Sequence, residues 1–167
     1  AVRLGLADDV AVGGAIAEMR RSLAAKGFVV HRWLVEQMAS GGVECVVGGL
    51  HDPEFGPMVM VGIGGIYVEV MRDVAFRICP IERDDAVRMV DELRGAALLR
   101  GARGGRAMSV DSLVQALLAV GGEDGLMMRY GERISEVDIN PLRVDETSAL
   151  ALDARILLVQ GPGRAPA

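Results

Sequence analysis

The chain has 167 residues, of which 51% are hydrophobic and 25% charged, and its formal net charge at pH 7 is −5. This charged share is ordinary for a globular protein and excludes general disorder. The acidic balance and an aromatic share of 4% argue against a nucleic-acid partner, which would require a basic surface and stacking side chains. No stretch approaches the roughly 18 apolar residues of a membrane span, and no signal peptide is visible. We therefore expect no membrane association. The two cysteines, Cys45 and Cys79, show no metal or redox spacing, and so few cysteines in a chain of this length indicate a reducing compartment, so we expect a cytoplasmic protein.

Two strands and one helix are predicted near the N-terminus. The apolar stretch Ala1–Leu6 and the β-branched and aromatic run Phe28–Val35 each favour a strand. Between them, apolar side chains recur at helical spacing behind Asp8 and Asp9, which can cap the helix, and Gly27 is placed to end it.

The next segment is predicted to consist mainly of strands. Val43–Leu50 and Met58–Val61 are apolar runs separated by the proline-bounded loop His51–Pro57. A glycine-rich turn follows at Gly62–Gly65, and Val74–Ile78 is a further strand.

The middle of the chain is predicted to be helical and the end to return to strands. Helical spacing of apolar residues indicates one helix over 84–93 and another that begins after Ser109 and ends at Gly121 and Gly122. The arginine- and glycine-rich segment 100–106 between them is expected to be irregular. Arg133–Asn140, ended by Pro141, and Ala149–Leu157 are predicted strands. Strands in hairpin-like succession with helices between them indicate an α+β fold with helices on one face of a sheet.

Oxygen-bearing side chains are concentrated in the last two predicted strands. Because side chains alternate along a strand, Glu136, Asp138 and Asn140 are expected on one face, and Asp153 can approach them if the strands pair. Carboxylate and amide oxygens are the ligands that Mg²⁺ prefers. A solvated outer face would produce the same alternation, so periodicity alone leaves both readings open.

Several segments resemble, in order and spacing, the ATP-grasp domain of NDP-forming acyl-CoA synthetases, the ADP-forming acetate–CoA ligases and relatives akin to the β-subunit of succinyl-CoA synthetase. The resemblance covers roughly residues 2–157. The segments that carry it are Glu36–Met38, Gly42–Glu44, Asp52–Pro57, Gly62–Glu69, Asp73–Arg77, Gly101–Gly104, Asp138–Leu142 and Asp153–Arg155.

The resemblance implies an ATP-grasp fold with mostly antiparallel sheets packed against helices. It implies a partial first lobe at residues 1–36, a complete second lobe at 37–158 and a disordered tail at 159–167. The family's phosphate-binding lysine, and the phosphorylatable histidine of its two-subunit members, fall upstream of the segment that matches Ala1. We therefore expect a truncated first lobe and little catalysis by this chain alone.

The resemblance also implies site residues, position by position. Asp138, Asn140 and Asp153 would hold Mg²⁺ against the phosphates of ATP or ADP. Glu36, Gln37 and Met38 would meet the adenine edge at a hinge between the lobes, and Glu44 would accept the ribose hydroxyls. Gly64 and Gly65 would let the backbone approach the phosphoryl group, and Arg77 and Arg103 are candidate phosphate contacts.

The implied function is phosphoryl transfer between Mg-nucleotide and an acyl phosphate or phosphohistidine, within an acid–CoA ligase. The implied partners are a CoA-binding domain, in the same chain or a separate subunit, and a small carboxylic acid or acyl-CoA. We also expect a homo-oligomer, because a truncated first lobe would leave the edges of Ala1–Leu6 and Phe28–Val35 unpaired. The alternative is a non-catalytic remnant or regulatory domain that binds partners, for example within a protein acetyltransferase.

Overall fold

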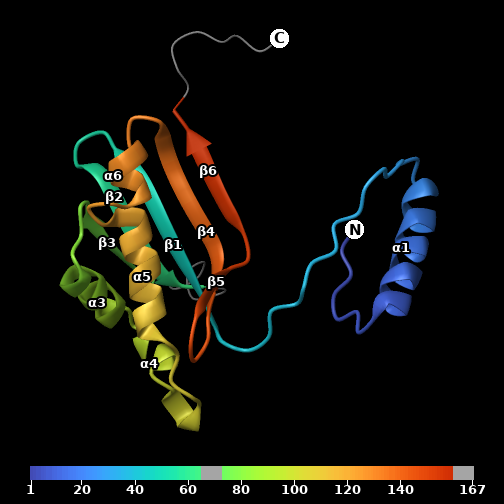
Figure 1. Cartoon of the computed structure of the whole chain (residues 1–167), viewed down its shortest axis with the longest axis horizontal. Coiled ribbons are helices and arrows are strands. Elements are labelled where there is room, and N and C mark those ends of the chain that lie inside the picture. Colours follow the sequence, from blue (N-terminus) through green and yellow to red (C-terminus); the bar gives the residue numbers. More distant parts are fainter. Residues whose placement is uncertain (65–72, 160–167) are drawn as a thin grey trace. The chain divides into compact units, whose positions relative to one another are not determined.

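The structure is a computed structural model that describes residues 1–64 and 73–159, and only the backbone of Arg103. It divides into two compact units, Ala1–Ser40 and the residues from Gly41 onward (Figure 1). This division concerns packing alone, so the assignment of residues 1–36 and 37–158 to two lobes stays a prediction. Among the described residues, no helix is both long and apolar enough to cross a membrane.

The first unit contains one helix, α1 (Asp9–Ala24). Its N-cap is Asp8, whose carboxylate accepts a hydrogen bond from the Ala11 N–H at 2.8 Å, and Gly27 with φ +83° follows its end. The helix and its cap are therefore confirmed. The predicted strands Ala1–Leu6 and Phe28–Val35 are wrong, because neither segment has regular structure. β-Branched composition favours extended backbone, but a strand exists only where another strand pairs with it.

The second unit is built on an antiparallel sheet with strand order β3-β2-β1-β4-β5, in which β6 also pairs with β4. The strands are β1 (Val43–Asp52), β2 (Gly56–Ile63), β3 (Val74–Ile78), β4 (Ile134–Val144), β5 (Ala149–Ala151) and β6 (Ala154–Leu158). The helices are α3 (Arg83–Glu92), α4 (Ala96–Leu99), η1 (Ala102–Gly104), α5 (Val110–Gly121) and α6 (Leu126–Tyr130). The helices lie on one side of the sheet (Figure 1).

The core lies between this sheet and its helices. Valines at alternate positions of β1 and β2 belong to this core, and α5 packs against both strands. The largest fully buried side chains of this core are Val47, Val59, Val61, Ile63, Met89, Val90, Leu99, Leu113, Val114, Leu117, Val120 and Met127. The opposite side of the sheet, here called the far face, carries the alternate residues, among them Glu44, Gly48 and Met60. Asp138, one of the predicted metal ligands, pairs in register with Gly48 and so lies on the far face.

Helices α3 and α5 begin as the sequence predicts. The Ser109 hydroxyl caps α5 by accepting from the Ser112 N–H at 3.2 Å. Glu82 and Asp85 form a reciprocal capping box at the start of α3, and the hydrogen bond from the Glu82 N–H holds the pKa of the Asp85 carboxyl below its usual value. The segment 100–106 is mainly irregular but includes the 3₁₀ turn η1.

Several strand boundaries differ from the prediction. β2 continues to Ile63, so Gly62 and Ile63, which are predicted to lie in a turn, belong to this strand. The loop predicted at His51–Pro57 is shorter, because β1 continues to Asp52 and β2 begins at Gly56. Pro141 does not end β4: the register against β1 shifts at this point, so a residue without an N–H is accommodated at a bulge. The single strand predicted at Ala149–Leu157 is two strands, β5 and β6, interrupted at Leu152 and Asp153.

Candidate functional site

The middle of β4 places carboxylates on the far face. Val137 is 2% exposed and belongs to the core, so the flanking Glu136 and Asp138 point to the far face, as alternation predicts. On β6, Arg155 pairs in register with Asp138 and forms an ion pair with Glu136 at 2.7 Å. The carboxylate of Glu136 is thereby occupied, whereas that of Asp138 forms no ion pair or hydrogen bond with any residue that the structure describes.

Asp153 lies beside Asn140, which confirms that these strands pair. The Asn140 N–H donates to the Asp153 carbonyl oxygen at 3.1 Å, in the gap between β5 and β6. Within the described part of the chain, the side chains of Asp138, Asn140 and Asp153 make no hydrogen bond or ion pair; Asp138 is half-buried and the other two are exposed. The same residues contain no group of three or more His, Cys, Asp or Glu side chains that could hold a metal ion. The predicted site offers two carboxylates and one amide, and its role stays a prediction.

Glu44 lies at the start of β1, directly opposite Arg143 of β4. Nη2 of Arg143 donates to Oε1 of Glu44 at 2.6 Å, and the exposed fractions of the two side chains are 22% for Arg143 and 43% for Glu44. The carboxylate predicted to meet the ribose is therefore already held by a cation. Arg143 is not among the site residues predicted from the sequence.

Gly64 lies against the backbone of Glu44 at the end of β2. Its N–H donates to the Glu44 carbonyl oxygen at 2.6 Å, and a Cβ added at Gly64 would lie 2.9 Å from that oxygen. Only glycine fits this approach without displacing the backbone. Gly65, the other predicted backbone contact, lies outside the described residues.

The structure does not bring Arg77 together with these residues. Arg77 pairs with Val59 across β3 and β2, which places it on the helix-covered side of the sheet. There it forms an ion pair with Glu92 of α3 and donates to the Phe76 carbonyl oxygen at 2.7 Å. Asp138 lies on the opposite side of the same sheet. A phosphate contact by Arg77 stays a prediction that this placement does not support.

The remaining predicted residues lie elsewhere. The backbone of Arg103 belongs to η1, and its side chain is not described. Glu36, Gln37 and Met38 are exposed residues of the first unit and lie in a segment without helix or strand. The adenine contact at these three residues stays a prediction.

Two features have no counterpart in the predicted site. Asp73 is 6% exposed, and its two carboxylate oxygens accept from the Arg94 N–H at 2.8 Å and the Gly95 N–H at 2.7 Å, which ties the start of β3 to the turn after α3.

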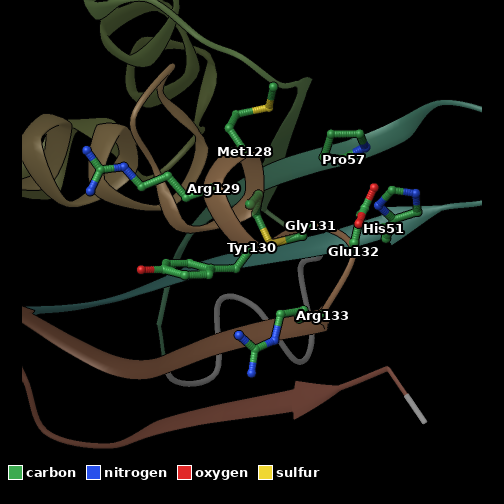
Figure 2. Close-up of a pocket in the computed structure, with 9 residues that line it drawn as sticks. His51, Pro57, Met128, Arg129, Tyr130, Gly131, Glu132 and Arg133 are labelled. Carbon is green, nitrogen blue, oxygen red and sulfur yellow. The ribbon is translucent and has the colours of Figure 1, made fainter. Parts of the chain in front are cut away.

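The second feature is an open pocket of about 360 Å³. It lies near the other end of β1 from Glu44, between the β1–β2 hairpin and α6 (Figure 2). Its lining residues are His51, Pro57, Met127, Met128, Arg129, Tyr130, Gly131, Glu132 and Arg133.

Comparison with known proteins identifies the family. A family model described as an ATP-grasp domain matches residues 1–158. The chain belongs to the ATP-grasp family. The β subunit of ADP-forming acetate–CoA ligase I from Pyrococcus furiosus is 42% identical over 125 residues, which are 75% of this chain and 52% of that protein. ADP-forming acetate–CoA ligase I from Archaeoglobus fulgidus is 43% identical over 125 residues, 75% of this chain and 18% of that protein. The chain thus spans about half the length of the first relative and less than a fifth of the second.

Solved structures agree with this assignment. Dinucleotide-forming acetyl-coenzyme A synthetase 1 from Ca. Korarchaeum cryptofilum, in complex with coenzyme A and Mg-AMPPCP, matches with a TM-score of 0.79 and 34% identity over 94% of this chain and 67% of that chain. PH1788 from Pyrococcus horikoshii Ot3 matches with a TM-score of 0.68 and 36% identity over 74% of this chain and 52% of that chain. The predicted α+β ATP-grasp fold, and the relation to NDP-forming acyl-CoA synthetases, are confirmed.

Proposed function

We propose that this chain is the nucleotide-binding part of an NDP-forming acyl-CoA synthetase, an acid–CoA ligase that moves a phosphoryl group between Mg-ATP or Mg-ADP and an acyl phosphate or phosphohistidine. The observation that carries the proposal is a set of three oxygen-bearing side chains on an ATP-grasp sheet that have no partner among the described residues. Asp138, Asn140 and Asp153 lie at neighbouring register positions, and their side chains make no hydrogen bond or ion pair within the described residues.

These three side chains suit a divalent cation. Two carboxylates and an amide oxygen are hard ligands, and neither carboxylate charge is balanced by an ion pair among the described residues. Bound Mg²⁺ would neutralise negative charge on the phosphate oxygens. The contribution of this chain is to hold the side-chain oxygens of Asp138 and Asn140 on a rigid strand. β4 is rigid because it is hydrogen-bonded to β1 on one side and to β5 and β6 on the other.

The partners follow from the same family. The Pyrococcus furiosus relative is named a β subunit, and the Korarchaeum structure contains coenzyme A. We therefore expect this chain to act with a CoA-binding domain on a small carboxylic acid or its CoA thioester, in the reducing cytoplasm that its two free cysteines suit. Homo-oligomerisation also stays a prediction. Its original support, unpaired strands at Ala1–Leu6 and Phe28–Val35, is absent from the structure.

The test is ATP formation by the complete protein, together with its CoA-binding partner, from ADP, phosphate and a panel of short and aromatic acyl-CoA thioesters. We expect Mg²⁺-dependent ATP formation that Asp138→Asn abolishes. Glu123→Gln is the matched control because Glu123 is exposed and makes no hydrogen bond within the described residues, so it should retain activity. Nucleotide binding without turnover of any thioester would favour the non-catalytic alternative, and absence of both would contradict the proposal.

A further inference from the structure

The Glu44–Arg143 pair differs from the other ion pairs of the described residues. With 22% of its side chain exposed, Arg143 is the most buried arginine among them. The Arg155–Glu136 pair, which joins neighbouring strands on the same face, has the opposite order, with 61% of Arg155 and 39% of Glu136 exposed. At Glu44 the arginine is therefore the more buried group and the carboxylate the more exposed one; several other pairs share this order, but none has an arginine as buried as Arg143.

The backbone of Glu44 is fixed on both sides. β1 is paired with β2 and with β4, and the Glu44 carbonyl oxygen accepts from the Gly64 N–H at 2.6 Å. A free glutamate side chain would still rotate about its side-chain bonds. The hydrogen bond from Arg143 restricts that rotation before any ligand arrives, which lowers the entropy that binding has to remove.

One oxygen of Glu44 remains available. Arg143 contacts Oε1, and Oε2 makes no hydrogen bond within the described part of the chain. A carboxylate oxygen is an acceptor only, so its complement is a donor such as a sugar hydroxyl. A base edge that presents an acceptor, or a phosphate oxygen, would be repelled.

We propose that Arg143 is a positioning residue that fixes the Glu44 carboxylate to accept the ribose hydroxyls, and so makes this part of the protein selective for ribonucleotides. This inference rests on the proposed nucleotide-binding function. Arg143 itself touches no nucleotide in this account and acts through Glu44.

The test compares the Kd of Mg-ADP with that of Mg-2′,3′-dideoxy-ADP in the complete protein, by titration calorimetry. A hydrogen bond from a hydroxyl to a carboxylate corresponds to a preference on the order of tenfold or more. We expect wild type to show that preference for ADP and Arg143→Met to lose at least about threefold of it, because Glu44 is no longer held. Glu44→Gln should lose the preference too, and adding Arg143→Met to Glu44→Gln should change the ratio no further.

Arg155→Met is the matched control, because it removes the other arginine–glutamate pair of the far face and should leave the ratio unchanged. If Arg143→Met does not fold, as judged by thermal melting, Arg143→Lys replaces it; a lysine lacks the guanidinium fork, so the ratio should again fall. Equal weakening of both nucleotides in the Arg143 variant would overturn the inference and leave the proposed function standing. Equal affinity of the wild-type protein for ADP and the dideoxy analogue would also overturn the inference and leave the proposed function standing. Absence of nucleotide binding by the wild-type protein would overturn the inference and the proposed function together.

Discussion

Asp73 should stabilise the second unit more than any exposed carboxylate does. Its side chain is 6% exposed and accepts two backbone hydrogen bonds, from the N–H groups of Arg94 and Gly95. The packing around it is close, since a Cβ added at Gly95 would lie 2.9 Å from Cγ1 of Ile63. The substitution Asp73→Asn keeps the size of the side chain but replaces one acceptor oxygen with an amide group that cannot accept. One of the two backbone N–H groups then loses its partner.

The expected cost follows from that single loss. A hydrogen bond to a charged group contributes about 1.5–3 kcal/mol, and a buried donor left unpaired costs a similar amount, so we expect unfolding to become easier by about 2–3 kcal/mol. For a unit of this size the melting temperature should fall by roughly 10 °C. Urea unfolding followed by circular dichroism measures the free energy, with an unchanged m-value as the sign that the unfolded state is the same.

Asp84→Asn is the control for this experiment. Asp84 is exposed in the first turn of α3 and makes no hydrogen bond within the described residues, so its substitution should cost less than about 1 kcal/mol. If Asp73→Asn were no more destabilising than Asp84→Asn, the carboxylate of Asp73 would not be what ties β3 to the turn after α3.

Three further predictions concern packing, acid stability and thiol reactivity. Gly121→Ala should destabilise the protein by about 1–3 kcal/mol in urea unfolding, because the new Cβ would lie 2.6 Å from Cβ of Val59; an unchanged midpoint would contradict this. The backbone N–H groups of Thr147 and Ser148 donate hydrogen bonds to Asp145 and keep the pKa of its carboxyl below the usual 3.8. The stability that the ionised carboxyl supplies is therefore present above pH 3.8 and is lost as the pH falls below that value. Asp145→Asn should therefore be less stable than wild type at pH 7 and lose less stability on acidification, and parallel pH profiles would refute this. Burial raises the pKa of Cys45 to about 12 and that of Cys79 to about 11, so neither thiol should react with Ellman's reagent at pH 8 until the protein is unfolded, and rapid labelling of the folded protein would be inconsistent with the structure.

Local sequence signals were sufficient for elements whose cause is local. The helix behind Asp8 and the helix behind Ser109 form where a capping side chain precedes apolar residues at helical spacing, and both are confirmed. The run Phe28–Val35 shows the limit of the same reasoning. Its composition favours extended backbone, yet no strand lies beside it among the described residues, and composition cannot supply a partner. Pro141 shows the converse, because a bulge in the pairing with β1 lets a proline remain inside β4.

The candidate site was predictable only where it depends on one strand pair. Alternation placed Asp138 on the far face, and pairing of the last strands brought Asp153 beside Asn140. Arg143 was not predictable, because its partner Glu44 is 99 positions away and the register of β1 against β4 is decided by the packing of the whole sheet. Arg77 has the same difficulty, since alternation gives two faces and does not say which one the helices cover.

The central claim is that β4 and the residues before β6 hold a magnesium–nucleotide complex. Its most direct test is calorimetric titration of Mg-ADP into the complete protein and into its Asp153→Asn variant. Asp153 has no ion pair or side-chain hydrogen bond among the described residues, and Arg155 pairs with Glu136 instead, so the substitution removes the proposed ligand and no contact that the structure describes. Two nearby carboxylates repel each other when no cation lies between them. We expect Asp153→Asn to bind Mg-ADP at least about tenfold more weakly, while the melting temperature of the nucleotide-free protein stays equal or rises slightly. Unchanged Mg-ADP affinity with a lowered melting temperature would contradict the central claim.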